Sequence, residues 1–470
     1  MSVTFLQRIW SSVAERGRVL ARLPHVEDPE ARAIELAHSL ISESGEATGA
    51  ARAVALIEAY EALRPDQRHR FHLYLACEFL PSPERLAAAA KAYLAAPTPG
   101  SAAQLHAASE APRQELLRRM NVAPGATHLL VRMREELLAA ARHNPELRPL
   151  EQDLHQVLTA WFNRGFLELR RIDWNISASV LEKLIAYEAV HEIRGWDDLR
   201  RRLAPDRRCF AFFHPAMPDE PLIFVEVALC RGLASEIAPL LSLATPRDDF
   251  ERADTAIFYS ISNCQPGLRG ISFGSFLIKQ VVEALSSELP GLKCFATLSP
   301  VPGLRAWLDR RLAAGDETLL TSEDRAAIAQ GSDGAATAEL AALLSATDWT
   351  GDESPGAPLR SVLLRLAARY LTASNEGRGP EDPVARFHLG NGARLERIHW
   401  RANLGARGLE ESYGVMVNYL YDPELIEANH EKFAAQRVVS YSSQVAEILG
   451  AGSWRTRGLS LVRSLGIAPD

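Results

Sequence analysis

Apolar residues recur at three- and four-residue spacing through the first 160 residues, which is the pattern of amphipathic helices. Residues 28–41 (DPEARAIELAHSLI) and 50–63 (AARAVALIEAYEAL) carry it most clearly. Residues 82–96 open with Ser82, Pro83 and Glu84, a cap residue, a first-turn proline and an early acid. Breaks are expected at 97–100 (PTPG) and 123–125 (APG). The pattern predicts an all-helical N-terminal domain over residues 1–160.

The pattern changes after residue 160, where short runs rich in β-branched and aromatic residues alternate with helical stretches. These runs predict strands at 209–214 (CFAFFH), 222–230 (LIFVEVALC), 256–262 (AIFYSIS) and 294–299 (CFATLS). Three later segments are also strand-like: 385–389 (ARFHL), 393–400 (ARLERIHW) and 414–421 (GVMVNYLY). GNG at 390–392 is interpreted as a hairpin turn. Residues 161–470 are therefore predicted to form an α/β domain with a mixed sheet, and the whole chain an α+β multidomain protein.

One helical insert is expected near residues 310–385. Two soft stretches interrupt it, at 331–336 (GSDGAA) and 351–358 (GDESPGAP). Such a segment is either a mobile lid or a set of surface helices between strands. We favour surface helices.

Composition is that of an ordinary globular protein: 470 residues, 47% hydrophobic and 24% charged. A net charge of −7 without a long Lys/Arg run argues against nucleic acid as a partner. Five cysteines, an odd number with no CxxC pair, fit a reducing compartment. No apolar stretch reaches membrane-spanning length, so no membrane partner is expected.

The chain ends bear on location. The first 24 residues contain several arginines and two adjacent serines, as organelle transit peptides do, but Glu15 breaks the acid-free pattern and an ordinary amphipathic helix is favoured. The C-terminal GIAPD contains no peroxisomal tripeptide. A cytoplasmic location is therefore expected.

A glycine-rich loop follows the predicted strand 256–262. It reads NCQPGLRGIS and precedes the helix-like FGSFLIKQVVEALSSEL. Gly267 and Gly270 would let the backbone approach a ligand, and the helix start would favour an anion such as a pyrophosphate. The loop matches neither a Walker nor a dinucleotide motif, so a purely structural turn fits it equally well. Its strand–loop–helix–strand frame resembles the coenzyme A site of the N-acetyltransferase superfamily.

Two further residues are candidates for chemistry. Ser299 stands at a predicted strand end, where a sheet can deliver a side chain into a cleft. Pro300 follows it and has no N–H, which argues against a nucleophile elbow and favours a hydrogen-bonding role. His388 lies beside the predicted hairpin turn and is either catalytic or structural. His69 and His72 have helical spacing, but no third ligand is evident, so no metal site is predicted.

Three segments together resemble the malonyl-CoA decarboxylase family: 260–285 (SISNCQPGLRGISFGSFLIKQVVEAL), 297–308 (TLSPVPGLRAWL) and 387–421 (FHLGNGARLERIHWRANLGARGLEESYGVMVNYLY). The resemblance implies a helical oligomerisation domain and an acetyltransferase-like catalytic domain. It implies conversion of malonyl-CoA to acetyl-CoA and CO2, and a homo-oligomer, dimer or tetramer. No cofactor is expected, because the thioester is itself the electron sink.

The same resemblance assigns roles to residues. The catalytic serine and histidine fall on Ser299, which would position the malonyl carboxylate, and His388, which would protonate the enolate. Better-known animal members have a glutamate where this chain has Ser272, so we expect no catalytic role for Ser272. The substrate-binding residues would be Arg269, Gly270, Ile271, Ser272, Phe273, Gly274, Ser275 and Tyr421.

Two other functions share the same loop. An acyl-CoA-dependent N-acyltransferase would need a base and an amine pocket. A non-catalytic malonyl-CoA sensor would bind without turnover. The matches at Ser299 and His388 count against both.

Overall fold

The computed structural model describes residues 26–42, 45–244, 250–271, 276–328, 336–346, 348–351, 357–373 and 379–450. The predicted first helix, residues 272–275 of the glycine-rich loop, and most of both soft stretches of the insert lie outside this set.

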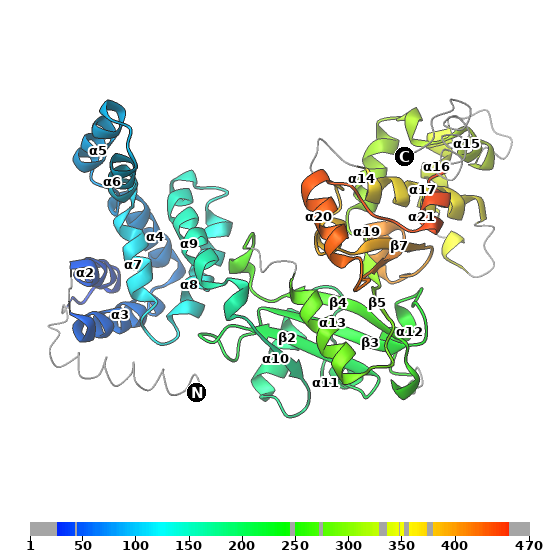
Figure 1. Ribbon diagram of the computed structural model, residues 1–470, viewed down its shortest axis with the longest axis horizontal. Coiled ribbons are helices and arrows are strands. Elements are labelled where there is room, and N and C mark those ends of the chain that lie inside the picture. Colours follow the sequence, from blue (N-terminus) through cyan, green and yellow to red (C-terminus); the bar gives the residue numbers. More distant parts are fainter. Residues whose placement is uncertain are drawn as a thin grey trace, which may run out of the picture.

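The N-terminal part is helical, as predicted. Ser82 caps its helix by accepting a hydrogen bond from the backbone N–H of Arg85 at 3.3 Å, and Gly125 separates two helices with φ +78°. Helices α2–α9 gather on one side of the molecule (Figure 1). They are α2 (Pro29–Ser42), α3 (Glu46–Glu61), α4 (Pro65–Glu78), α5 (Pro83–Ala95), α6 (Pro99–Ser109), α7 (Pro112–Met120), α8 (Ala126–Ala140) and α9 (Arg148–Trp161).

A mixed sheet follows, also as predicted. Its strands are β1 (Glu168–Ile172), β2 (Arg207–Phe213), β3 (Ile223–Cys230), β4 (Thr255–Asn263), β5 (Cys294–Thr297), β6 (Ser299–Pro300), β7 (Arg394–His399) and β8 (Met416–Leu420). Within the described residues the order is β1-β2-β3-β4-β5-β8-β6, with β7 also paired to β8. Only β4 and β5 run parallel in this set; the other pairs are antiparallel. The sequence patterns did not predict β1.

Helices cover both faces of the sheet. Helix α13 (Phe276–Glu288) buries Val281 and Leu285 against Phe258 on one face, completing the predicted strand–loop–helix–strand unit (Figure 1). On the other face, α10 and α11 bury Leu184 and Leu199. The remaining helices after the first strand are α10 (Ala178–Tyr187), α11 (Trp196–Arg202), α12 (Ala238–Leu241), α14 (Leu304–Ala313), α15 (Ser322–Ile328), α16 (Ala336–Ser345), α17 (Ala357–Thr372), α18 (Pro383–Gly390), α19 (Ala406–Ser412), α20 (Ile426–Gln436) and α21 (Ser443–Ile448).

The described parts of the insert are helical, as expected. Helices α14–α17 enclose an apolar cluster of their own, which includes Leu308, Leu340 and Leu363. Tyr413 from the C-terminal part of the chain completes this cluster. The insert therefore consists of surface helices that have a hydrophobic core of their own.

One prediction of secondary structure is wrong. Residues 385–389 form helix α18 and not a strand, and GNG at 390–392 ends that helix and is not a hairpin turn. Asp382 caps the helix through the N–H of Ala385 at 2.8 Å, and Pro383 occupies its first turn. Gly392 has φ +84°, and a Cβ there would lie 2.0 Å from the carbonyl oxygen of Ile426.

None of the helices in the described part of the chain combines the length and apolarity that a membrane span needs.

Candidate active site

Ser299, His388 and Tyr421 meet in the buried interior beside the sheet. The Oγ atom of Ser299 lies 3.1 Å from Nε2 of His388, and the hydroxyl of Tyr421 lies 2.7 Å from Nδ1 of the same ring. Three different elements supply them: β6, helix α18, and the residue that follows β8. The structure thus brings together three residues that the sequence singled out in separate segments.

The hydrogen bonds assign the histidine tautomer. Ser299 donates its hydroxyl proton to Oγ1 of Thr297 at 2.9 Å, and that oxygen also accepts the backbone N–H of Tyr419 at 3.0 Å. Ser299 must then accept from Nε2–H of His388, which leaves Nδ1 to accept from the hydroxyl of Tyr421. In this arrangement the Nε2 proton points toward the serine.

Burial controls the charge of this histidine. His388 is only 3% exposed, and desolvation lowers its pKa to about 3. Its ring stacks on Tyr419 with centroids 4.6 Å apart. Desolvation also raises the pKa of Tyr421 well above its ordinary value. Near pH 7 the free protein therefore holds a neutral imidazole beside a neutral phenol.

The sheet divides at this point. Strand β4 pairs with β5 from Thr255 to Phe258, and the last bond across this edge joins Leu298 N–H to the carbonyl of Phe258 at 3.0 Å. Beyond it, residues 260–263 of β4 pair with β3, while Ser299 pairs with Val417 of β8. The division leaves β4 without a second strand partner among the described residues, next to the catalytic candidates.

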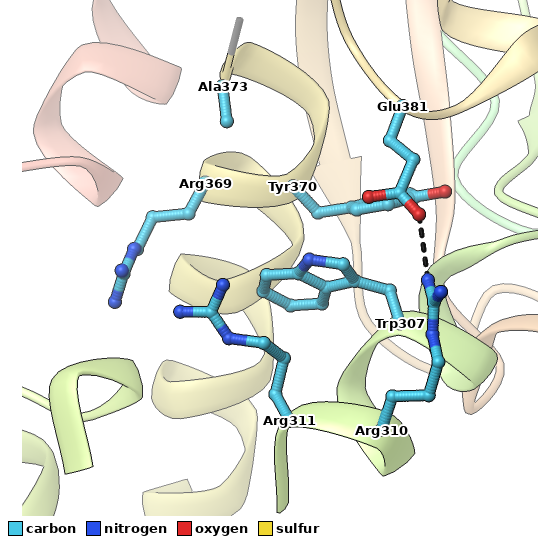
Figure 2. A pocket seen from close by; sticks show the side chains of 7 residues that line it. All are labelled: Trp307, Arg310, Arg311, Arg369, Tyr370, Ala373 and Glu381. Carbon is cyan, nitrogen blue, oxygen red and sulfur yellow. Dashed lines mark hydrogen bonds and ion pairs between the residues drawn. The ribbon is translucent and has the colours of Figure 1, made fainter. Parts of the chain in front are cut away.

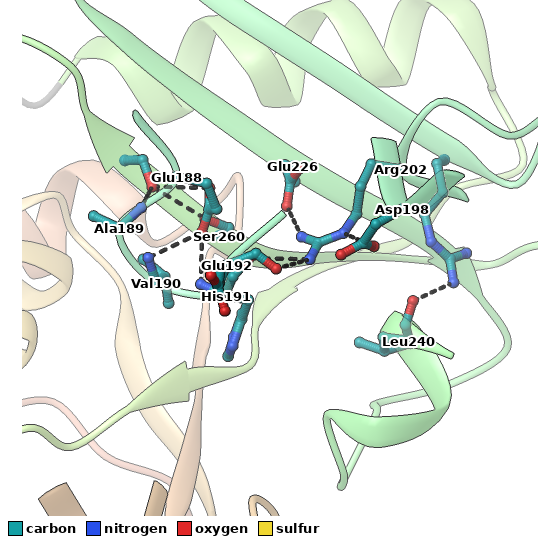
Figure 3. A network of polar contacts seen from close by, with 12 residues as sticks. Glu188, Ala189, Val190, His191, Glu192, Asp198, Arg202, Glu226, Leu240 and Ser260 are labelled. Atoms are coloured by element: carbon teal, nitrogen blue, oxygen red, sulfur yellow. Dashed lines mark hydrogen bonds and ion pairs between the residues drawn. The ribbon is translucent and has the colours of Figure 1, made fainter. Parts of the chain in front are cut away.

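On the opposite face of the sheet, a polar network holds the part of β4 that no longer pairs with β5 (Figure 3). The carboxylate of Glu188 accepts hydrogen bonds from Ser260 Oγ at 2.7 Å and Ser262 Oγ at 3.0 Å. The backbone N–H groups of Val190 and His191 bind the same carboxylate at 2.9 and 2.7 Å. Such a network holds a strand in place where sheet bonding ends on one side.

The same figure shows Arg202 between two carboxylates. It binds Glu226 at 2.5 Å and Asp198 at 3.3 Å, and the side chains of Arg202 and Glu226 are each 1% exposed. Glu226 belongs to β3, so this ion pair joins α11 to the strand beside β4.

A second support lies under helix α18. The carboxyl of Asp382 is fully buried, and burial raises its pKa to about 6 against the opposing effect of hydrogen bonds from backbone N–H groups, including those of Ala385 and Gly303. Gly303 sits so close to Tyr370 that a Cβ would lie 2.2 Å from the phenol oxygen. The segment after Ser299 and the start of the helix that carries His388 are therefore held together.

A cavity of about 350 Å³ lies beside Tyr370, and Figure 2 shows the side chains that line it. Its arginines are already engaged. Arg310 binds Glu381 at 2.7 Å, Arg311 binds Asp316 at 2.5 Å, and Arg369 donates to the carbonyl of Leu319 at 2.6 Å. Two of the three charges are therefore paired with carboxylates, whereas Arg369 is bound to a neutral carbonyl and keeps its charge. It is lined by Trp307, Arg310, Arg311, Arg369, Tyr370, Ala373 and Glu381.

The glycine-rich connection is described only in part. Arg269 and Gly270 are exposed, Gly270 has φ +83°, and Ile271 is 6% exposed within the helical core. No hydrogen bond among the described residues joins these three to the catalytic candidates. Ser272, Phe273, Gly274 and Ser275 lie outside the described residues.

Sequence reasoning missed the supporting residues. Thr297 opens one of the segments that carry the family resemblance but was given no role. Glu188 and Asp382 stand in no recognisable motif, and for Asp382 the available signal was the Asp-Pro pair at the start of α18. In the described part of the chain, no three His, Cys, Asp or Glu side chains gather to hold a metal ion. His72 is buried and bonds to the hydroxyl of Tyr60 at 2.8 Å.

Comparison with known families gives two matches. The malonyl-CoA decarboxylase C-terminal domain matches residues 165–457, and the malonyl-CoA decarboxylase N-terminal domain matches residues 79–162.

Individual relatives agree. The mitochondrial malonyl-CoA decarboxylase of the goose Anser anser anser is 39% identical over 334 residues, 68% of this chain and 66% of that protein. The rat protein is 36% identical over 336 residues, 69% of this chain and 68% of its own length. These alignments span about two thirds of the curated relatives.

Among solved structures, malonyl-CoA decarboxylase from Rhodopseudomonas palustris is 46% identical, with a TM-score of 0.81. The enzyme from Agrobacterium vitis is 45% identical, also with a TM-score of 0.81. Each alignment covers 89% of this chain and 99% of the other.

Proposed function

The chain belongs to the malonyl-CoA decarboxylase family and is by that membership a carboxy-lyase that converts malonyl-CoA to acetyl-CoA and CO2; we propose that Ser299 and His388 carry out the reaction. The observation that carries this proposal is the 3.1 Å contact between Ser299 Oγ and His388 Nε2 beside the division of the sheet. Ser299 orients the malonyl carboxylate, so that the breaking C–C bond aligns with the carbonyl π system.

The reaction consumes one proton, because a carboxylate leaves as CO2 and its carbon takes up hydrogen. In the free protein His388 is neutral, since burial lowers its pKa to about 3. A substrate carboxylate placed beside the ring favours the imidazolium, so the histidine gains a proton as the substrate binds. Loss of CO2 transfers that negative charge to the enolate and leaves an imidazolium next to the enolate carbon. The imidazolium then protonates the carbon, which neutralises both groups.

Tyr421 keeps the ring in the productive orientation. Its hydroxyl bonds to Nδ1 at 2.7 Å, which directs Nε2 toward Ser299 and the substrate. When the ring is protonated, the phenol oxygen accepts from Nδ1–H by rotating its own proton away. The tyrosine then stays neutral throughout, in keeping with its raised pKa.

The coenzyme binds the connection between β4 and α13. Arg269, Gly270 and Ile271 begin this segment, and Ser272, Phe273, Gly274 and Ser275 complete it. An exposed Arg269 can pair with a phosphate, and a glycine with positive φ allows close backbone approach. The edge of β4 that faces away from β3, beyond the division of the sheet, then offers backbone groups to the pantetheine arm.

The remaining proposals concern assembly and location. Residues 1–160 are a helical oligomerisation domain, and residues 161–470 the catalytic domain with its insert near 310–385. Helices α5 and α6 contain no buried residue in the described structure, which suits a surface that a second copy covers in a dimer or tetramer. The protein acts in the cytoplasm, in fatty acid metabolism.

Purified protein incubated with malonyl-CoA, without metal or an acyl acceptor, tests the function. We expect acetyl-CoA and CO2 in equal amounts, followed by mass spectrometry and CO2 trapping. Intact malonyl-CoA with measurable binding would favour a sensor. Release of free coenzyme A only when an amine is added would favour an N-acyltransferase.

A further inference from the structure

The connection between β4 and α13 rests on the helical part of the chain. Leu268 and Ile271 are 3% and 6% exposed, and both belong to the apolar cluster formed mainly by helices α2–α9. Gly267 approaches α8 so closely that a Cβ would lie 1.9 Å from the carbonyl oxygen of Val131. The start of the proposed coenzyme segment is therefore built against α8 and is not held by the sheet alone.

A buried arginine fixes this contact. Arg134 of α8 is 2% exposed, and its Nη1 donates to the carbonyl oxygens of Gly267 at 2.6 Å and Arg269 at 2.9 Å. Glu151 of α9 balances its charge, with Nη2 to Oε1 at 2.9 Å. A buried guanidinium is costly unless it is paired and hydrogen-bonded, and here its partners are one carboxylate and two loop carbonyls.

The direction of these bonds matters for an anionic ligand. Carbonyl oxygens carry partial negative charge and would repel phosphate groups. Arg134 holds two of them toward α8, so they are turned away from any ligand on the other side of the segment. A segment held in this way also loses less conformational freedom when the ligand binds, which favours affinity.

We propose that Arg134 is a positioning residue for the coenzyme's phosphate groups, through which the helical part of the chain sets the affinity for the coenzyme. This inference rests on the proposed function of the β4–α13 connection. Arg134 acts through the backbone of residues 267–269 and does not touch the substrate itself. Its loss should affect only substrates that carry the phosphates.

The test compares two thioesters. Malonyl-CoA carries the pyrophosphate, whereas malonyl-pantetheine ends before it. For Arg134→Met we expect kcat/KM for malonyl-CoA to fall about tenfold, mainly through KM, and the kcat/KM for malonyl-pantetheine to stay within about twofold of the wild-type value. The Kd of acetyl-CoA, measured by calorimetry, should rise by a similar factor. Arg134→Lys keeps the charge with fewer donors and should give a smaller effect of the same kind.

Arg113→Met is the matched control. Arg113 is also buried, binds a carboxylate (Asp153, 2.5 Å) and donates to the carbonyls of Ala76 and Phe79 at 3.3 and 3.2 Å, all within the helical part. It should lower the melting temperature without changing the ratio of the two kcat/KM values.

Three outcomes would overturn the inference: equal loss on both thioesters in Arg134→Met, the same selective loss in Arg113→Met, or an unchanged Kd for acetyl-CoA. A wild-type protein that fails to decarboxylate malonyl-CoA would contradict the proposed function instead. The acetyl-CoA measurement would still test Arg134 in that case.

Discussion

The hydroxyl of Tyr421 lies 2.7 Å from Nδ1 of His388, on the side of the ring opposite Ser299. The histidine is thus held at both nitrogens by neutral partners, in a site where burial keeps the ring uncharged. The arrangement separates the function of the two nitrogens: Nε2 faces the chemistry and Nδ1 fixes the orientation.

Removing the Tyr421 hydroxyl should therefore slow turnover without abolishing binding. For Tyr421→Phe we expect kcat to fall about 10- to 100-fold, because an unfixed ring satisfies the geometry of proton transfer less often. KM should change little. Tyr419→Phe is the control, since Tyr419 stacks on the same ring but no hydrogen bond joins its hydroxyl to His388 in the described structure. Equal losses in the two variants would contradict an orienting hydrogen bond.

Removing either catalytic candidate should have a larger effect. We expect Ser299→Ala and His388→Asn each to lower kcat about 10²- to 10⁴-fold, the range of a positioned general acid, while the Kd of acetyl-CoA stays near its wild-type value. Steady-state kinetics and calorimetry measure the two quantities. Ser412→Ala removes a hydroxyl that is equally buried but bonds to the carbonyls of Gly408 and Val415, and should retain activity. Near-normal turnover in both catalytic variants would refute the assignment.

Substrate binding should take up protons from solution. His388 is neutral in the free protein above a pKa of about 3 and gains a proton only beside the substrate carboxylate. Calorimetry in buffers of different ionisation enthalpy should detect uptake with S-(2-carboxyethyl)-coenzyme A, which carries the carboxylate without the thioester. Acetyl-CoA should show none. Identical values for the two ligands would exclude this source of the proton.

The same reasoning predicts the pH dependence of the rate. Above the pKa of free His388, each catalytic event needs a proton from solution, so kcat/KM for malonyl-CoA should fall about tenfold for each unit of rising pH while binding remains in rapid equilibrium. A flat profile between pH 6 and 9 would contradict this mechanism.

Asp382 should make stability depend on pH. The ordinary pKa of an aspartate carboxyl is 3.8, and that of Asp382 in the folded protein is about 6, so the folded state favours the protonated acid. The resulting stabilisation is present below 3.8 and is lost as pH rises through about 6. Asp382→Asn keeps a capping oxygen without the charge. The difference in melting temperature between this variant and the wild type should therefore shift in favour of the variant between pH 4 and 6. The shift should persist at pH 7.

Asp382→Ala separates the cap from the charge. It removes the capping oxygen and should lose about 1–2 kcal/mol of stability relative to Asp382→Asn at every pH. Equal melting temperatures for the two variants would show that the cap contributes nothing.

The sequence predicted the helical part, the central strands and the unit that carries the glycine-rich connection, because periodicity and caps are local properties. It misplaced residues 385–389, although Asp382 and Pro383 are helix-start signals, because the glycines at 390 and 392 suggested a hairpin. Gly392 instead lets the backbone pack directly against Ile426, where a side chain would clash. No local sequence pattern encodes this contact between distant segments.

Ser299 and His388 were candidates from their positions at a strand end and beside a turn, but only the resemblance assigned them catalytic roles. Their meeting depends on β8 pairing with both β5 and β6, and on α18 packing beside them, which are tertiary relationships. Thr297 and Glu188 act through hydrogen bonds that include partners far along the chain, Tyr419 for Thr297 and Ser260 for Glu188. Their residue types alone therefore carried no signal. The catalytic roles of Ser299 and His388 stay predictions until the variants are measured.

Strand β8 lies inside the sheet but is synthesised late, so the sheet stays incomplete for part of synthesis. Strand β5 pairs with β8 on the side away from β4, but Met416 leaves the ribosome roughly 120 residues after Thr297, about 6–24 s later at about 5–20 residues per second. During that interval one edge of β5 lacks its native neighbour, and exposed edges invite pairing with other chains. Nascent chains stalled before residue 416 should therefore aggregate or bind chaperones, whereas full-length chains should not.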